Sequence, residues 1–252
     1  MKKIRNIIVA IIILTAFCGI STMAAEKEIK LTNKKWYTYQ NTDNSKDPVN
    51  FKIQVNGTGY VKIEGNGYST PEMSYKSGLI VNYYNQNWKQ MHSSSYRSVF
   101  DHQPGYFAVK KGTYYIQVPS YYKVDIRYTF VNVKEKSGSK KSKAVTIKKN
   151  KTAKGTLQFG ESLSKTDWYK IKLTKKQKVN IYFTGGATYF LNLEIIPASK
   201  KTMIINNRTS ICIGTNVWKS AGKLPKGTYY IKVNRSTVSS KEDCGMYTVR
   251  WK

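Results

Sequence analysis

Acidic residues are scarce in this sequence, with 14 Asp and Glu against 43 Lys and Arg, and histidine occurs only twice. Glycoside hydrolysis needs paired carboxylates, and a zinc site needs three or four His, Cys or carboxylate ligands at suitable spacing. His102 could pair with Asp101 and a serine of residues 93–95, but that stretch contains no nucleophile elbow. No phosphate-binding glycine loop is present either. We therefore expect no enzyme activity, no catalytic residue and no metal site.

Long hydrophobic runs are missing after the first 25 residues. Those residues combine a basic start, an apolar run of about 14 residues and small residues before Glu26, a pattern typical of a cleaved secretory signal. The run is short for a membrane span, which needs about 20 residues, so an uncleaved anchor is the alternative. We expect a mature chain without a transmembrane segment. It should lie outside the cell, either released or associated with the cell wall.

Cysteine is also rare, and only Cys212 and Cys244 lie beyond the predicted signal. Because disulfides form in oxidising compartments, secretion favours a bridge between these two residues. Two free thiols are the alternative, because the sequence does not show whether the geometry suits a bridge.

Amphipathic helical patterns are absent, and most of the sequence alternates between apolar and polar residues. Alternation with a period of two is typical of half-buried β-strands. It is clearest in VDIRYTF (124–130), WYKIKL (168–173) and VNIYF (179–183), which Lys-rich or Gly-rich turns separate. The pattern predicts an all-β fold of the sandwich or barrel type.

The sequence repeats itself once. KKGTYYIQV (110–118) matches PKGTYYIKV (225–233) at an offset of 115 residues, and three shorter pairs match at offsets of 116 to 119 residues. These pairs are IKLTNKK (29–35) with VTIKKNK (145–151), NFKIQV (50–55) with WYKIKL (168–173), and YTF (128–130) with YTV (247–249). Because repeated units fold alike, we expect two domains of similar structure.

The repeat divides the chain into a signal peptide at 1–25, a first domain at 26–133 and a second at 145–252. Between the domains, residues 134–144 are basic and almost free of apolar side chains, which predicts a flexible linker. Within each repeat, Tyr114 and Tyr229 align with aliphatic residues and should be buried. Their neighbours, Tyr115 and Tyr230, should point outward.

The segments DWYKIKL, KVNIYF, LPKGTYYIKV and GMYTVRW, in this order, resemble the bacterial pre-peptidase C-terminal domain. The resemblance covers nearly all of residues 145–252 and, more loosely, 29–133. It implies two tandem jelly-roll-like β-sandwich domains, similar to the collagen-binding domains of clostridial collagenases. Some members bind calcium through acidic residues near the start of the domain, where this sequence has Glu161 and Asp167 among lysines. From the residues we expect no cofactor.

Aromatic residues and positive charge provide the candidate binding residues. The chain has 20 tyrosines and five tryptophans, which suit recognition surfaces because they bury a large area at low entropic cost. The candidates are Tyr83, Tyr84, Trp88, Tyr96 and Tyr115 in the first domain and Trp168, Lys170, Lys172, Tyr230 and Lys232 in the second. The aromatic insertion, residues 83–106, could be a ligand site or a small local core.

The basic surplus is uneven, because residues 145–252 carry 21 basic and five acidic groups whereas residues 26–133 carry 14 and eight. A field of this sign attracts anionic partners. We expect a secreted, non-catalytic adhesion module that binds an anionic envelope polymer, a glycan or an extracellular matrix protein, and we do not expect nucleic acid because the chain is exported. The alternatives are an envelope protein retained by charge alone and an unrecognised small secreted hydrolase.

Overall fold

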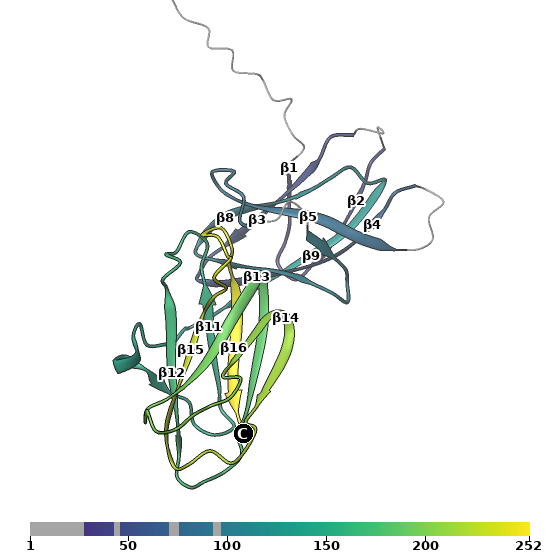
Figure 1. Cartoon of the computed structure of the whole chain (residues 1–252). Coiled ribbons are helices and arrows are strands. Elements are labelled where there is room, and N and C mark those ends of the chain that lie inside the picture. Colours follow the sequence, from purple (N-terminus) through teal and green to yellow (C-terminus); the bar gives the residue numbers. More distant parts are fainter. Residues whose placement is uncertain (1–27, 43–45, 71–75, 93–96) are drawn as a thin grey trace, which may run out of the picture.

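A computed structural model describes residues 28–42, 46–70, 76–92 and 97–252 of the chain, so the predicted signal peptide lies outside the described residues. The regular structure within them is nearly all β-strand, with a short 3-10 helix, η1 (Lys141–Lys143). Two curled sheets form one sandwich domain each, which confirms the predicted all-β fold (Figure 1). No helix in the described part of the chain is long and apolar enough to span a membrane.

The first domain contains the strands β1 to β9, in the sheet order β1-β3-β8-β5-β4-β9-β2, with β6 beside β5 and β7 beside β4. Their bounds are β1 Glu28–Lys30, β2 Trp36–Gln40, β3 Val49–Val55, β4 Gly59–Tyr68, β5 Ser77–Asn85, β6 Arg97–Val99, β7 Gly105–Val109, β8 Gly112–Val118 and β9 Lys123–Asn132. The pairs are antiparallel except β1 with β3, which is parallel.

The second domain contains the strands β10 to β16, in the order β10-β12-β15-β13-β16-β11, with β14 beside β13. Their bounds are β10 Val145–Thr146, β11 Thr152–Leu157, β12 Thr166–Leu173, β13 Asn180–Pro197, β14 Arg208–Lys219, β15 Gly227–Arg235 and β16 Gly245–Trp251. Here too the first strand, β10, pairs in parallel with its neighbour β12.

The two sheets share one connectivity, because β10, β12, β15, β16 and β11 take the places of β1, β3, β8, β9 and β2. The hairpin of β4 and β5 corresponds to the single long strand β13. Its first part pairs with β16 and its second part with β15, and its pairing with β14 is irregular between Gly186 and Leu191. The sequence repeat is therefore a repeat of topology.

The registers of the two sheets also agree with the repeat. Ile29 pairs with Phe51 in the first domain, and Val145 pairs with Tyr169 in the second, as the aligned segments predict. Tyr114 is buried and its hydroxyl donates to a backbone carbonyl four residues earlier, at 2.9 Å. Tyr229 is buried and makes the same bond at the same distance.

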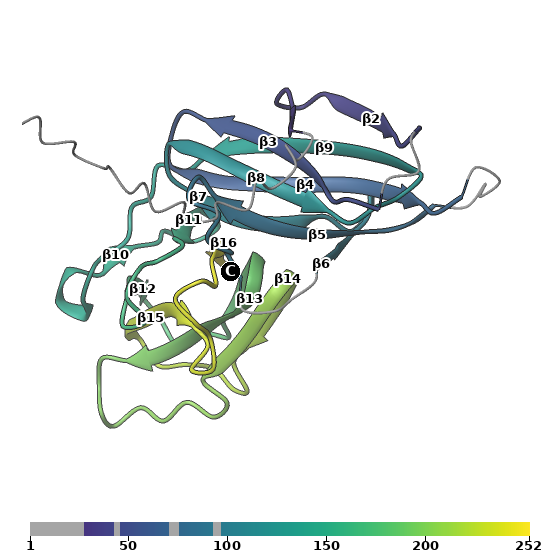
Figure 2. The same cartoon turned by 90° about the horizontal axis from the view of Figure 1, so that it is seen from above.

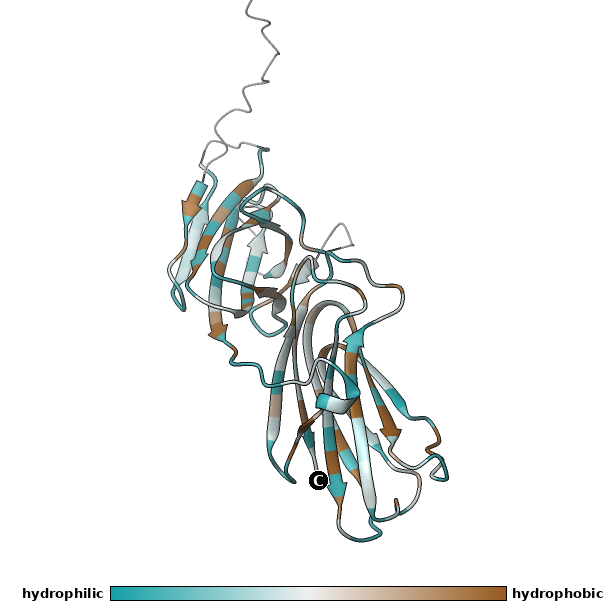
Figure 3. Ribbon diagram, turned by 90° about the vertical axis from the view of Figure 1, so that its left-hand side faces the viewer, coloured by the Kyte–Doolittle hydropathy of each residue, from teal (hydrophilic) through white to brown (hydrophobic). Residues whose placement is uncertain are grey.

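Alternate residues of each strand face the core. In β12, Tyr169, Ile171 and Leu173 are buried, whereas Trp168 and Lys170 are only partly covered. Hydrophobic and hydrophilic residues alternate along the strands in Figure 3. Because burying apolar side chains contributes most of the stability of a folded domain, this alternation holds each curled sheet closed around its own core.

The two domains pack directly against each other, with the strands of the first crossing above those of the second (Figures 1 and 2). β7 contacts β13 and β16 of the second domain. The ring of Tyr106 lies so close to Gly186 that a Cβ atom there would be 2.7 Å from the ring carbon Cγ. Cys244 belongs to the core cluster of the first domain, and Lys89 forms an ion pair with Glu242 at 3.3 Å.

Residues 134–144, predicted as a flexible linker, instead lie against the second domain. The backbone of Gly138 pairs with that of Trp168 at 2.9 and 3.0 Å, and the Glu135 carboxylate accepts from the Thr156 amide at 3.1 Å. The ammonium of Lys141 lies 4.8 Å above the ring of Tyr230. The basic composition of this segment does not predict these contacts, because they are made by backbone groups and by its single acidic residue.

The predicted disulfide between Cys212 and Cys244 is wrong, because neither residue is part of a disulfide. The Cys212 thiol donates to the carbonyl of Ala187 at 3.3 Å, within the second domain. The Cys244 thiol points to the first domain, where it lies 3.8 Å from the carbonyl of Met91. Burial raises the pKa of Cys244 to about 12, so this thiol is an inert part of the domain interface.

Candidate functional site

The outer face of β3, β8 and β5 brings polar and aromatic residues together in two rows. In one row Lys52 pairs with Tyr115, which pairs with Tyr84. In the other, Asn50 pairs with Gln117, which pairs with Asn82. Since residues directly opposite each other on one face of a sheet lie about 5 Å apart, the six side chains are neighbours on this face, although Asn50 itself is buried.

Trp88 covers this surface. Its ring stacks on Tyr115, with the ring centroids 4.4 Å apart and the planes inclined by 11°. The ring of Tyr84 lies at 5.5 Å on the same indole, tilted by 51°. Trp88 nevertheless keeps 45% of its surface exposed. We call Tyr84, Trp88 and Tyr115 the aromatic platform.

A tight loop after β5 presents Trp88. The side-chain oxygen of Asn85 accepts from the backbone amides of Asn87 and Lys89, at 3.0 and 2.9 Å. The Trp88 amide donates to the Asn85 carbonyl at 3.0 Å, and Trp88 itself has a φ of 56°. An Asn side chain that replaces backbone bonds in this way is a common device for a turn. The indole is therefore held in place before any ligand arrives.

Amide groups surround the platform. The Tyr84 hydroxyl lies 3.4 Å from the Gln117 carbonyl oxygen, and the Gln117 amide donates to Asn50 at 3.3 Å. The Oδ1 atom of Asn82 is buried without a hydrogen-bond partner among the described residues. Buried polar atoms usually have a partner, but this oxygen is closed to solvent, so the accessible amide of the surface is that of Gln117.

The other first-domain candidates differ in their placement. Tyr83 is 1% exposed and stacks on Phe107 in the core at 4.5 Å, so it is not part of a binding surface. Its neighbour Tyr84 faces outward because alternate residues of β5 point to opposite sides. Tyr96 lies outside the described residues.

The second-domain candidates lie on the equivalent face. Trp168 pairs with Lys232, and Lys170 pairs with Tyr230, in the positions that Asn50, Gln117, Lys52 and Tyr115 take in the first domain. Lys172 follows in the next row, opposite Thr228. Here Lys141 lies over the ring of Tyr230, whereas in the first domain Trp88 covers the equivalent ring of Tyr115. Residues 134–144 therefore cover part of this face of the second domain.

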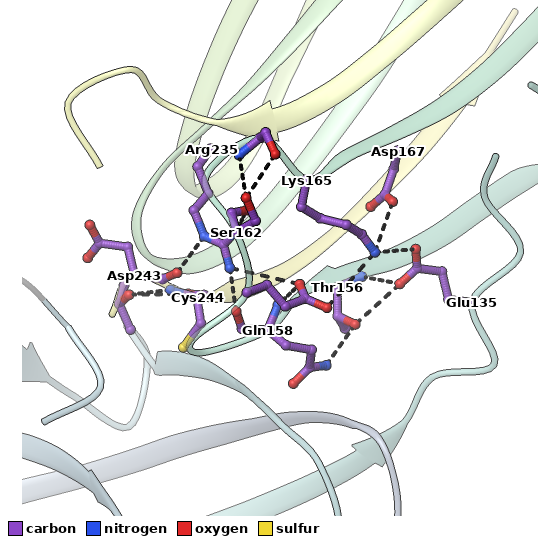
Figure 4. A network of polar contacts seen from close by, with 12 residues as sticks. Glu135, Thr156, Gln158, Ser162, Lys165, Asp167, Arg235, Asp243 and Cys244 are labelled. Carbon is purple, nitrogen blue, oxygen red and sulfur yellow. Dashed lines mark hydrogen bonds and ion pairs between the residues drawn. The ribbon is translucent and has the colours of Figure 1, made fainter. Parts of the chain in front are cut away.

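A polar network links residues 134–144 to the second domain (Figure 4). The ammonium of Lys165 lies 4.0 Å from Glu135, 4.0 Å from Glu161 and 3.4 Å from Asp167. Because this ammonium occupies the space between the three carboxylates, they do not fit a calcium site. Among the described residues, no group of three or more His, Cys, Asp or Glu could hold a metal ion.

Asp167 is the most buried acid of this network. Its carboxylate accepts from Tyr247 at 2.6 Å and from Ser137 at 2.9 Å. Burial, and secondly the nearby charge of Glu135, raise the pKa of Asp167 to about 6, although these hydrogen bonds and Lys165 oppose the rise. The network is closed toward the core, where the Tyr247 hydroxyl meets that of Tyr169 at 2.9 Å.

The histidines show no catalytic arrangement within the described residues. His102 lies 3.0 Å from Asp101, which also accepts from Lys76 at 3.2 Å and from Asn66 at 3.3 Å. These contacts lower the pKa of Asp101 to about 2, and the hydrogen bond with His102 contributes most to this change. His92 is buried against Tyr83. The serines considered as a nucleophile lie outside the described residues.

No protein-family model matches this sequence, and no curated protein matches it. Among solved structures, the pre-peptidase C-terminal domain of collagenase from Bacillus anthracis is 18% identical, with a TM-score of 0.30 over 48% of this chain and all of that domain. The CUB1-EGF-CUB2 domains of rat MASP-1 are 10% identical (TM-score 0.27; 89% of this chain and all of that chain). The CBM22 tandem domain of Paenibacillus barcinonensis Xyn10C is 12% identical (TM-score 0.25; 88% of this chain and 94% of that chain). Likeness at this level says nothing about function.

The sequence candidates did not include Lys52, Asn50 or Gln117. Lys52 and Asn50 lie on β3, and Gln117 lies two residues beyond Tyr115 on β8. The internal repeat could have found all three, because Asn50, Lys52 and Gln117 align with the candidates Trp168, Lys170 and Lys232.

Proposed function

We propose that this protein is a non-catalytic module that binds an extracellular polymer, a glycan or a matrix protein, through the aromatic platform of its first domain. The observation that carries the proposal is the stack of Trp88 on Tyr115, which holds a flat ring in place and leaves it 45% exposed. Rigid aromatic side chains with amide groups beside them are typical of recognition surfaces. The extracellular location rests on the predicted signal peptide.

A glycan agrees best with the residues around the platform. The apolar face of a sugar ring stacks well on an aromatic ring, and its hydroxyls need polar partners such as the Gln117 amide. Charge contributes little to this contact, because Lys52, the cation of the surface, is paired with Glu28 at 2.8 Å. Binding through the platform should therefore persist as the salt concentration rises.

The test is an array of glycans and matrix proteins probed with the mature protein, followed by titration of the strongest ligand. We expect Trp88→Ala to weaken binding roughly thirtyfold, since a central aromatic anchor contributes about 2 kcal/mol. Trp36→Ala is the matched control, because Trp36 lies on β2 and is 46% exposed. It should leave the affinity unchanged.

Three results would contradict the proposal. Equal losses from Trp88→Ala and Trp36→Ala would show that the platform is not the site. Binding only at low salt would favour retention by charge alone. Turnover of a bound glycan would show that the protein is a hydrolase.

A further inference from the structure

Two edge strands of the second sheet, β10 and β11, follow each other closely in the chain. β10 ends at Thr146 and β11 begins at Thr152, and within the described residues each pairs with one neighbour, β12 and β16 respectively. The turn between them is closed by a hydrogen bond from the Lys151 amide to the Lys148 carbonyl at 3.0 Å. Asn150 in this turn has a left-handed φ of 63°. The turn brings both sheet edges to one side of the domain.

Two hollows open beside this turn, with volumes of about 420 and 400 Å³. They adjoin each other, because Thr146, Ile147 and Lys148 line both. Five lysines line the first hollow: Lys134, Lys136, Lys148, Lys151 and Lys154. The second adds Lys149, Lys172 and Lys175. We call the two hollows the basic groove.

No acidic residue lines the basic groove, and none of its lysines forms an ion pair among the described residues. The acids of the second domain have partners elsewhere. Glu161 and Asp167 face Lys165, and Glu194 pairs with Arg208. Glu242 reaches across to the first domain. The positive charge of the groove is therefore not cancelled by neighbours.

Concave surfaces lined by one sign of charge concentrate the electric field and attract ligands of the opposite sign. All eight lysines are exposed, so their ammonium groups can reach a ligand without displacing protein contacts. The aromatic residues that line the groove are core residues, with Tyr169 fully buried and Trp251 only 4% exposed. Recognition here would therefore depend on charge and shape and not on stacking.

We propose that the basic groove binds a linear polymer that carries phosphate or sulfate groups along its chain. Two adjoining hollows with lysines on both sides suit an extended chain better than a flat lipid surface. The free sheet edges, β10 and β11, add backbone amides that can donate to oxyanions. The site is separate from the aromatic platform and does not depend on it.

The test measures binding of the full mature chain to two probes, an oligothymidylate of about 20 nucleotides for repeated phosphates and dextran sulfate for repeated sulfates. The variant combines Lys148→Glu, Lys151→Glu and Lys154→Glu. Binding of a lysine to a phosphate releases counterions, which favours the complex. Because the variant loses such contacts, we expect at least about a tenfold loss of affinity for the oligonucleotide near physiological salt. The slope of log K against log salt should also fall by about 2.

The matched control combines Lys200→Glu, Lys201→Glu and Lys223→Glu, which are exposed, lie outside the groove and change the net charge equally. We expect it to keep most of the affinity. The proposal is overturned if both triple variants lose affinity equally, because binding then follows net charge alone. It is also overturned if the protein binds anionic phosphatidylserine vesicles but neither polymer. Trp88→Ala should leave binding of the oligothymidylate unchanged, so this probe tests the groove independently of the platform.

Discussion

At the scale of single residues, burial decides which charges matter. Asp167 is fully buried in the second domain and meets Lys165, Tyr247 and Ser137. Burying a carboxylate costs free energy that hydrogen bonds and one ammonium recover only in part. This is why the pKa of Asp167 rises to about 6, from an ordinary value of 3.8.

A raised pKa links the stability of the protein to pH. Between pH 4 and 6 the folded chain holds a proton on Asp167 that the unfolded chain releases, so the free energy of unfolding falls as the pH rises through this range. The contribution of this residue is on the order of 3 kcal/mol at most. We expect Asp167→Asn to flatten the pH dependence between pH 4 and 6, measured by urea unfolding at several pH values. The same slope in both proteins would contradict this assignment.

At the scale of elements, the loop after β5 positions the aromatic ring on which the proposed binding surface depends. The Asn85 side chain replaces two backbone bonds of the loop, and the loop in turn holds Trp88 on Tyr115. The equivalent face of the second domain has Lys141 in place of the indole, supplied by η1. One framework therefore carries two different surfaces, because the added segments differ while the strands agree.

The loop gives a prediction of its own. Asn85→Ala removes the acceptor for two amides and should lower the free energy of unfolding by about 1 kcal/mol. Hydrogen exchange of the amides of Asn87 and Lys89 should become faster, because their hydrogen bonds are lost. Asn87→Ala is the control, because its side chain lies in the same loop and is exposed. Equal exchange in both variants would show that Asn85 does not order the loop.

At the scale of the whole molecule, the two domains share a packed interface. Tyr106 of β7 lies on Gly186 of β13, and Cys244 completes the core of the first domain. Lys89 joins the domains by its ion pair with Glu242 and lies 5.6 Å above the ring of Phe159. We therefore expect the platform and the basic groove to keep a constant separation, so that one polymer or two could be held in a defined geometry.

Gly186→Ala tests the interface. The added methyl group would lie 2.7 Å from the Tyr106 ring, so this ring or the backbone around it must shift. We expect a loss of about 1 to 3 kcal/mol in urea unfolding, the usual cost of overpacking. Gly222→Ala is the matched control, because nothing lies within 4 Å of a Cβ atom built there. If the two variants are equally stable, Tyr106 does not pack tightly on the second domain.

The sequence by itself determined the fold class and the repeat. Alternation of apolar and polar residues is a local property, so Tyr169, Ile171 and Leu173 could be assigned to the core without knowing their partners. The duplicated Gly-Thr-Tyr-Tyr-Ile segment predicted the shared burial of Tyr114 and Tyr229, which the structure confirms. Cleavage of a signal peptide and secretion stay predictions.

The tertiary structure alone decided which side chains act together. Lys52 lies beside Tyr115 of the platform only because β3 pairs with β8, although about sixty residues separate these strands in sequence. Cys212 and Cys244 have separate partners because Cys244 faces the other domain. The lysines of the basic groove come together because residues of β10, β11 and the segment before them line the same hollow. Such long-range pairing depends on how strands associate, and the local pattern of a single strand does not record it.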